Sequence, residues 1–223
     1  MFFKNLRADI KAAKVNDPAA RNWFEIWLTY SGVHALSWHR VAYFFHKMKL
    51  KLLARIISQM ARFFTGIEIH PAAKIEGGVF IDHGSGVVIG ETAEVHKGTV
   101  IYQGVTLGGT GKERGKRHPT IMENVTLSAG AKVLGGFTVG KGAKIGAGAV
   151  VLKEVPPYAT VVGVPGRIVR IRTPEKEDAI HTGIIATAAN AEVAKEELER
   201  REQEAKALAE IAEEKRHGKP KNE

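Results

Sequence analysis

The chain contains no cysteine among its 223 residues, and this absence excludes several kinds of protein. Without thiols there is no disulfide framework, no thiolate metal site and no cysteine nucleophile. Residues 1–10 carry charges at Lys4, Arg7 and Asp9 and lack the apolar stretch of a signal peptide. No window of the sequence approaches the length of a membrane span. We therefore expect a cytoplasmic protein with no membrane partner.

Negative charge is also scarce, because 24 acidic residues face 33 lysines and arginines and leave a net charge of +9. This balance fits ordinary solvated basic side chains, and it also fits a partner that carries phosphates, either a nucleic acid or a phosphorylated cofactor. A nucleic-acid binder is expected to combine basic residues on one face with exposed aromatic side chains. Here the aromatic residues fall in apolar helical segments, so we expect no nucleic-acid partner.

Residues 1–65 have the periodicity of a helical domain. Apolar residues recur at steps of three and four between Trp23 and Phe64. The pair Asp17-Pro18 predicts a helix start, with an acidic cap and proline at the first helical position. Gly32 predicts a break between helices, and residues 50–64 predict a further apolar helix. The apolar stripe indicates a core or a subunit interface.

From residue 67 to about residue 171 the apolar period changes to six. Neither a helix nor an extended strand gives a step of six, but a short strand followed by a tight corner does, and three such units close one triangular coil. Stacked coils bury a column of aliphatic side chains and pair their strands in parallel, which predicts a β-helix. The aliphatic positions are Ile69, Ile75, Ile81, Ile89, Val95, Ile101, Leu107, Ile121, Leu127, Val133, Val139, Ile145 and Val151.

The sequence therefore divides into three parts. Residues 1–65 form a helical domain, and residues 66–171 form the β-helix. Residues 172–223 are rich in Ala, Glu, Lys and Arg and predict a charged helix or tail. The fold class expected from this division is α+β.

The six-residue repeat is interrupted twice, at residues 82–86 and 108–119. Loops on a rigid scaffold are common positions for functional sites. His83 in the first interruption is suited to take a proton near neutral pH. Glu68 precedes it by 15 residues, which predicts a place on the adjoining coil from which a carboxylate orients the imidazole. Arg117 in the second interruption offers a planar fork that suits a carboxylate.

Two other functions fit the repeat less well. A zinc enzyme needs three converging ligands, and His83, His96 and His118 are the candidates. No second histidine follows His118 closely, and Asp82-His83 is more typical of acid–base chemistry, so we expect no metal. A purely structural β-helix that polymerises needs neither interruption.

Several segments together resemble the serine acetyltransferase family over roughly residues 5–171. They are Asp82 to Thr92, Gly104 to Lys112 with Arg117-His118-Pro119, Lys144 to Gly148 through Val164-Pro165-Gly166-Arg167, and the helical residues 17–20 and 32–39. The resemblance implies a left-handed parallel β-helix. It also implies transfer of acetyl from acetyl-CoA to the hydroxyl of L-serine, which gives O-acetyl-L-serine and CoA in the first step of cysteine biosynthesis.

The resemblance also implies residue roles. His83 is expected to be the general base, and Glu68 stands where the family often has the aspartate partner of that histidine. The substrate ammonium is expected to contact Asp17 and Asp82, and the substrate carboxylate Arg117 and His118. The residues expected to line the CoA groove are Gly109, Ala129 and Lys144.

The family implies a homotrimer or a dimer of trimers, with each site between two chains, and L-cysteine as feedback inhibitor. Many members end in an isoleucine that docks into O-acetylserine sulfhydrylase, but this chain ends in residues 219–223, Lys-Pro-Lys-Asn-Glu, which argues against that complex. Homoserine or a sugar is the alternative acceptor, and Asp17, Asp82 and Arg117 favour a zwitterion over a sugar. A trimeric scaffold for partner binding is a further alternative.

Overall fold

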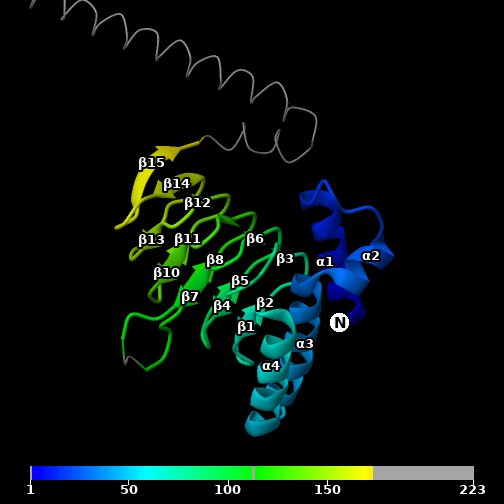
Figure 1. Ribbon diagram of the computed structural model, residues 1–223. Coiled ribbons are helices and arrows are strands. Elements are labelled where there is room, and N and C mark those ends of the chain that lie inside the picture. The colour runs from blue at the N-terminus through cyan, green and yellow to red at the C-terminus, as the bar shows by residue number, and fades with distance from the viewer. Residues whose placement is uncertain (1, 112–113, 173–223) are drawn as a thin grey trace, which may run out of the picture. The chain divides into compact units, whose positions relative to one another are not determined.

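The computed structural model describes residues 2–111 and 114–172, which belong to one compact unit, Met1–Arg172. Within these residues four helices precede fifteen short strands (Figure 1). Apart from Arg172, the predicted C-terminal extension (residues 172–223) lies outside the described residues, so its predicted helix stays a prediction.

The helices are α1 (Phe2–Asn16), α2 (Trp23–Thr29), α3 (Ser31–Lys47) and α4 (Lys51–Thr65). The predicted helix start at Asp17 is wrong. The Asp17 carboxylate accepts the N–H of Ala19 at 2.8 Å, a short-range bond that favours a turn over a helix. Helix α2 begins only at Trp23, where Asn22 caps it by accepting the N–H of Glu25 at 2.9 Å.

The predicted break near Gly32 is present, but it lies at Tyr30, between α2 and α3. Tyr30 has extended backbone angles, with φ −82° and ψ 109°. Gly32 itself lies in the first turn of α3, where a Cβ atom would be 2.2 Å from the carbonyl oxygen of Ile81. Gly32 therefore allows α3 to approach the β-helix closely. The apolar helix predicted over residues 50–64 is confirmed as α4, and the chain leaves it through Gly66 in a left-handed conformation.

The β-helix consists of three parallel sheets, and the strands from β1 to β13 join sheets I, II and III in turn. Sheet I has the order β1-β4-β7-β10-β13, sheet II β11-β8-β5-β2 and sheet III β15-β14-β12-β9-β6-β3. Only β15 is antiparallel, as the last strand of a closing hairpin with β14. The strands are β1 (Glu68–Ile69), β2 (Lys74–Ile75), β3 (Phe80–Ile81), β4 (Val88–Ile89), β5 (Glu94–Val95), β6 (Val100–Ile101), β7 (Thr106–Gly108), β8 (Thr120–Ile121), β9 (Thr126–Leu127), β10 (Lys132–Leu134), β11 (Thr138–Val139), β12 (Lys144–Ile145), β13 (Val150–Val151), β14 (Ala159–Val162) and β15 (Arg167–Ile171).

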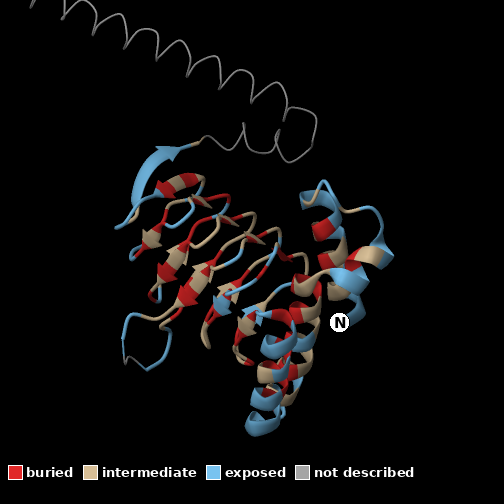
Figure 2. Ribbon diagram, in the orientation of Figure 1, coloured by how far each residue is buried: buried red, intermediate tan, exposed pale blue. Residues whose placement is uncertain are grey.

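The predicted six-residue period is confirmed, because each predicted aliphatic position lies in one of these strands. Most of them form a buried column inside the triangular coils, including Ile101, Leu107 and Ile121, which have no exposed surface. Figure 2 shows this buried column running through the stacked strands. The period therefore defines both the coils and their core.

Three edges separate the sheets, and we name each edge by the sheets that it joins. The first interruption leads from β3 to β4 and lies on edge III–I. The second leads from β7 to β8 and lies on edge I–II. The two interruptions predicted to carry chemistry thus lie on different edges of the same chain.

The helices pack against the first coil. Helix α3 adds Leu36 to the buried column. Asp9 of α1 joins three elements, because it forms a buried ion pair with Arg40 of α3 at 2.5 Å and accepts the N–H of Gly78 at 2.8 Å. Burial raises the pKa of Asp9, although Arg40 and the Gly78 N–H oppose that shift. Among the described residues no helix is both long and apolar enough to cross a membrane.

Candidate functional site

The first interruption places His83 at the surface of edge III–I. His83 adopts a left-handed backbone with φ 58°, an uncommon conformation for a residue with a side chain. Its side chain is 72% exposed, and its Nε2 atom lies 3.8 Å from Oδ2 of Asp82. The hydroxyl of Ser31, at the start of α3, lies 3.4 Å from the His83 carbonyl. The helical domain therefore contacts this turn directly.

Asp17 and Tyr30 lie near His83. The Tyr30 hydroxyl donates to Oδ2 of Asp17 at 2.5 Å. This bond and the bond from Ala19 lower the pKa of Asp17, and a charged His83 lowers it further. Burial raises the pKa of Tyr30 to about 12, with added contributions from Asp17 and from the charge of Asp82. Because these groups influence one another electrostatically, Asp17, Tyr30, Asp82 and His83 form one cluster, called here the His83 cluster.

Tyr30 is a residue that the sequence analysis did not assign to the site, because it was placed in the apolar stripe of the helices. The signal for its role is weak: a tyrosine in such a stripe still carries a hydroxyl that needs a partner. Only the turn at Asp17 brings the carboxylate to that hydroxyl, and this turn was predicted as a helix start.

A second cluster lies on edge I–II, where Arg117 and His118 end the long loop. Arg117 donates to the carboxylate of Glu91 at 2.7 Å. His118 is buried, and its Nδ1 atom accepts the N–H of Thr92 at 3.1 Å. Burial, followed by the charge of Arg117, lowers the pKa of His118. These four residues are called here the Arg117 cluster.

His70 lies on the same edge and was also missed. Burial lowers the pKa of His70, and the charges of Glu91 and Arg117 influence it in opposite directions. Its ring centroid lies 6.4 Å from that of His46 on α3. His70 therefore borders the Arg117 cluster, on the side that faces the helices.

The zinc alternative fails within a single chain, because its three histidines lie on three different edges. His83 is on edge III–I, His96 follows β5 on edge II–III, and His118 precedes β8 on edge I–II. In the described part of the chain, no group of three or more His, Asp or Glu side chains is placed to hold a metal ion.

Glu68 lies on the coil that adjoins the His83 turn, because β1 pairs with β4 and the N–H of Gly86 donates to the carbonyl of Gly66 at 3.0 Å. The Glu68 carboxylate lies 3.1 Å from Arg62 and 3.9 Å from Arg55, both on α4. These arginines are the partners of the Glu68 carboxylate within one chain, so its action on His83 stays a prediction. The carboxylate beside His83 is that of Asp82.

The three residues predicted to line a CoA groove are spread along the β-helix. Ala129 follows β9 on edge III–I, the edge of His83, and Lys144 lies on β12 in sheet III. Gly109 begins the long loop on edge I–II, where a Cβ atom would lie 3.2 Å from the carbonyl oxygen of Arg117. Gly109 therefore belongs with the Arg117 cluster, and Ala129 lies further along the edge that carries His83.

The six-residue coils and the loops at their corners place the chain in the class of hexapeptide-repeat transferases. The family model described as bacterial transferase hexapeptide (six repeats) matches residues 118–153. Closer relatives narrow this class. A serine acetyltransferase of Bacillus pumilus is 64% identical over 169 residues, which cover 76% of this chain and 78% of the relative.

Solved structures agree with that match. A serine acetyltransferase in complex with cysteine is 44% identical with a TM-score of 0.76, over 77% of this chain and 67% of the other. A serine acetyltransferase of Brucella abortus strain S19 in complex with coenzyme A is 43% identical with a TM-score of 0.74, over 77% and 69% of the two chains. The chain belongs to the serine acetyltransferase family, and it is an acyltransferase that uses acetyl-CoA as co-substrate.

Proposed function

We propose that His83 is the general base for acetylation of L-serine and that each acceptor site forms between two copies of the chain. The observation that carries this proposal is the separation of the two clusters. The His83 cluster offers carboxylates and an imidazole on edge III–I, and the Arg117 cluster offers donors on edge I–II. Serine has an ammonium for the His83 cluster and a carboxylate for the Arg117 cluster. A cyclic trimer brings edge III–I of each chain to edge I–II of its neighbour.

The two ends of serine fit the two clusters. Asp17 and Asp82 receive the ammonium, and the lowered pKa of Asp17 keeps that carboxyl ionised. Arg117 and His118 of the neighbouring copy donate to the carboxylate. Binding at both ends aligns the serine hydroxyl with the thioester. A sugar offers neither charge, so this arrangement favours a zwitterionic acceptor.

His83 removes the hydroxyl proton as the serine oxygen attacks the acetyl carbonyl. The Asp82 carboxylate, 3.8 Å from His83 Nε2, stabilises the imidazolium that forms. Backbone N–H groups near Gly108 and Gly109 support the oxyanion. As the C–S bond breaks, the imidazolium returns its proton to the CoA thiolate, so that no covalent enzyme intermediate is required.

The remaining partners follow from the same site. Gly109, Ala129 and Lys144 line the groove for CoA. L-Cysteine has the shape of serine, and a related enzyme has been solved with cysteine, which supports cysteine as a competitor for the acceptor site. The trimer, alone or paired, and the cytoplasmic location are also part of the proposal.

The test mixes two damaged chains. His83→Ala is expected to lower kcat about 10²–10⁴-fold, and Arg117→Ala is expected to raise KM for serine. Because each variant damages a different edge, a mixed trimer has up to about one intact site in three. Co-refolded mixtures are therefore expected to regain activity in a thiol-release assay, with serine preferred over homoserine and a sugar panel.

The matched control mixes His83→Ala with Asp82→Asn, two changes on the same edge. No mixed trimer then has an intact His83 cluster, so the activity is expected to equal the average of the parents. Failure of the first mixture to exceed its parents would place the complete site within one chain. A near-normal kcat for His83→Ala would remove the base assignment.

A further inference from the structure

The turn Gly90-Glu91-Thr92 carries no predicted role, yet it holds both donors of the Arg117 cluster. Five hydrogen bonds join Thr92 to residues 116–118. This network of bonds joins two segments that lie about one coil apart on the same edge. It points to a positioning function for Thr92.

The Thr92 hydroxyl uses all of its hydrogen-bonding capacity. It accepts the N–H of Arg117 at 3.1 Å and the N–H of His118 at 3.0 Å, and it lies 2.9 Å from Nδ1 of His118. A hydroxyl has two acceptor positions and one proton. With both acceptor positions occupied, its proton points to the His118 ring.

The backbone of Thr92 decides the tautomer of His118. The Thr92 N–H lies 3.1 Å from Nδ1 of His118, and an amide N–H can only donate. Nδ1 must therefore be unprotonated, which leaves the ring proton of a neutral imidazole on Nε2. Protonation of Nδ1 would turn two donors toward each other. The low pKa of His118, which results from burial and the neighbouring Arg117 and Lys116 charges, agrees with this neutral state.

The other two residues of the turn complete the support. A Cβ atom on Gly90 would lie 2.0 Å from Cδ2 of the His118 ring, so only glycine admits the ring at this depth. Glu91 holds the Arg117 guanidinium at 2.7 Å. The Lys116 ammonium donates to the Thr92 carbonyl at 2.8 Å. The end of the long loop is thus fixed at three successive residues.

We infer that Thr92 is a positioning residue that fixes His118 as an Nε2–H donor and so sets the affinity of the site for the carboxylate of the acceptor amino acid. The inference rests on the proposed role of His118 in carboxylate binding. Such a contact is made with the bound substrate as well as with the transition state. Its loss is therefore expected to raise KM for serine and leave kcat nearly unchanged.

The kinetic test compares Thr92→Val, which keeps the backbone N–H but removes the hydroxyl that accepts the Arg117 and His118 N–H groups, with Thr92→Ser, which keeps both. Thr92→Val is expected to raise KM for serine about tenfold, the equivalent of roughly one lost hydrogen bond. KM for acetyl-CoA is expected to stay within about twofold, and Thr92→Ser is expected to restore most of the affinity. The control Thr99→Val removes another turn hydroxyl, which donates to the Met122 carbonyl on edge II–III.

The second readout is the His118 tautomer in the full-length enzyme, from nitrogen NMR of histidine-labelled protein with the signal assigned through His118→Gln. The inference expects an unprotonated Nδ1 and a protonated Nε2 in the wild type. A proton on Nδ1 overturns it whatever the variants do. Equal serine KM values for Thr92→Val and wild type also overturn it.

His118→Ala separates this inference from the function beneath it. If His118→Ala raises KM for serine and Thr92→Val does not, the positioning role fails and the carboxylate role stands. If His118→Ala leaves KM unchanged, the carboxylate role fails, and with it the inference.

Discussion

Individual side chains in both clusters depend on partners that are distant in sequence. Asp17 is held by Tyr30 across the turn between α1 and α2, and Thr92 holds Arg117 and His118. In each case a polar group receives the bond that a buried or half-buried donor requires. The chemistry of the site is therefore set by pairs of residues, and of these only Tyr30 lies outside the segments that resemble the family.

His39 provides a residue-level prediction about stability. It lies buried on α3, and burial, assisted by the charge of Arg40, lowers its pKa to about 3. A lowered histidine pKa means that the unfolded chain binds the proton more readily below pH 6.5. The contribution of His39 to stability is therefore complete above about pH 6.5. As the pH falls below that value, the free energy of unfolding decreases by up to about 1.4 kcal/mol per pH unit.

Urea unfolding at pH 7 and pH 5.5 measures this loss, and His39→Gln is the comparison because it keeps an N–H donor but does not titrate. The wild type is expected to lose more unfolding free energy than His39→Gln between the two pH values. Asp9, whose raised pKa acts in the opposite direction, is present in both proteins and cancels in the difference. Equal losses would contradict a neutral buried His39.

Whole elements followed from the sequence more reliably than their ends. The six-residue period predicted the strands because each buried aliphatic residue repeats at a fixed step, and this pattern depends only on local sequence. The helix start at Asp17 was wrong because a capping carboxylate also stabilises a turn. The offset of 15 residues placed Glu68 on the correct coil, but its ion pairs with Arg55 and Arg62 depend on α4, which residue counting does not include.

The sequence identified most residues of the two clusters, but it did not predict on which edge of the β-helix each cluster lies. His83, Asp82, Arg117 and His118 stood out because they interrupt a repeat. Their separation onto different edges depends on which corner each interruption occupies, and this requires the sheet assignment of every preceding strand. Tyr30 gave only a weak local signal, the hydroxyl that it carries within an apolar stripe.

Gly32 tests how the helical domain is joined to the β-helix. A Cβ at this position would meet the Ile81 carbonyl at 2.2 Å and the Ile81 Cβ at 2.9 Å, so Gly32→Ala must push α3 away from β3. We expect a loss of about 1–3 kcal/mol of unfolding free energy, although alanine is the better helix former. Thermal unfolding checks this, with Gly111→Ala as control because no atom of the described residues lies within 4 Å of a Cβ there. An unchanged midpoint for Gly32→Ala would show that α3 does not pack on β3 as described.

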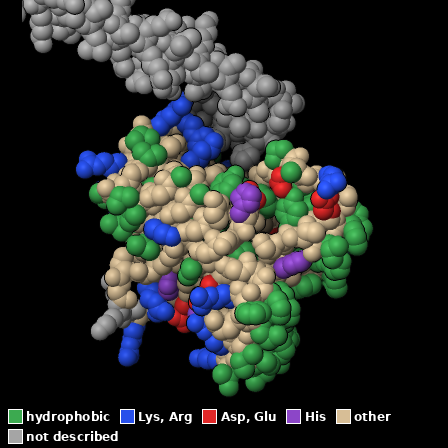
Figure 3. Space-filling model, in the orientation of Figure 1, with side chains coloured by type: hydrophobic (Ala, Val, Ile, Leu, Met, Phe, Trp, Pro, Cys, Tyr) green, Lys and Arg blue, Asp and Glu red, His purple; other side chains and the backbone are tan. Residues whose placement is uncertain are grey.

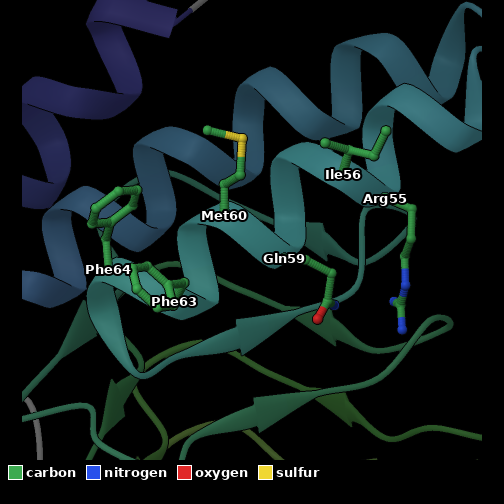
Figure 4. A pocket seen from close by; sticks show the side chains of 6 residues that line it. All are labelled: Arg55, Ile56, Gln59, Met60, Phe63 and Phe64. Atoms are coloured by element: carbon green, nitrogen blue, oxygen red, sulfur yellow. The ribbon is translucent and has the colours of Figure 1, made fainter.

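Helix α4 presents an apolar face outward. Figure 3 shows hydrophobic side chains gathered over the α3–α4 hairpin, and Figure 4 shows the side chains of α4 that line a groove there. The groove is lined by Arg55, Ile56, Gln59, Met60, Phe63 and Phe64. With Phe63 82% exposed, this face is of the kind that protein contacts cover.

At the scale of the whole molecule, the net charge of the chain affects the two substrates differently. Acetyl-CoA is an anion because of its phosphates, whereas serine is a zwitterion with no net charge near neutral pH. A chain with a net charge of +9 attracts the first and leaves the second nearly unaffected. The positive balance noted at the start therefore fits a phosphorylated co-substrate.

This difference predicts how the two Michaelis constants respond to salt. Raising the ionic strength from about 0.01 M to about 1 M shortens the Debye length from about 30 Å to about 3 Å. We expect KM for acetyl-CoA to rise several-fold, because the long-range attraction is screened. KM for serine is expected to change much less, because its contacts are short-range and its net charge is zero. Both constants are measured from initial rates, with one substrate varied while the other is saturating. A comparison of chloride and glutamate salts at equal ionic strength separates screening from competition by the anion. Equal responses of the two constants would mean that the positive charge of the chain acts away from the acetyl-CoA site.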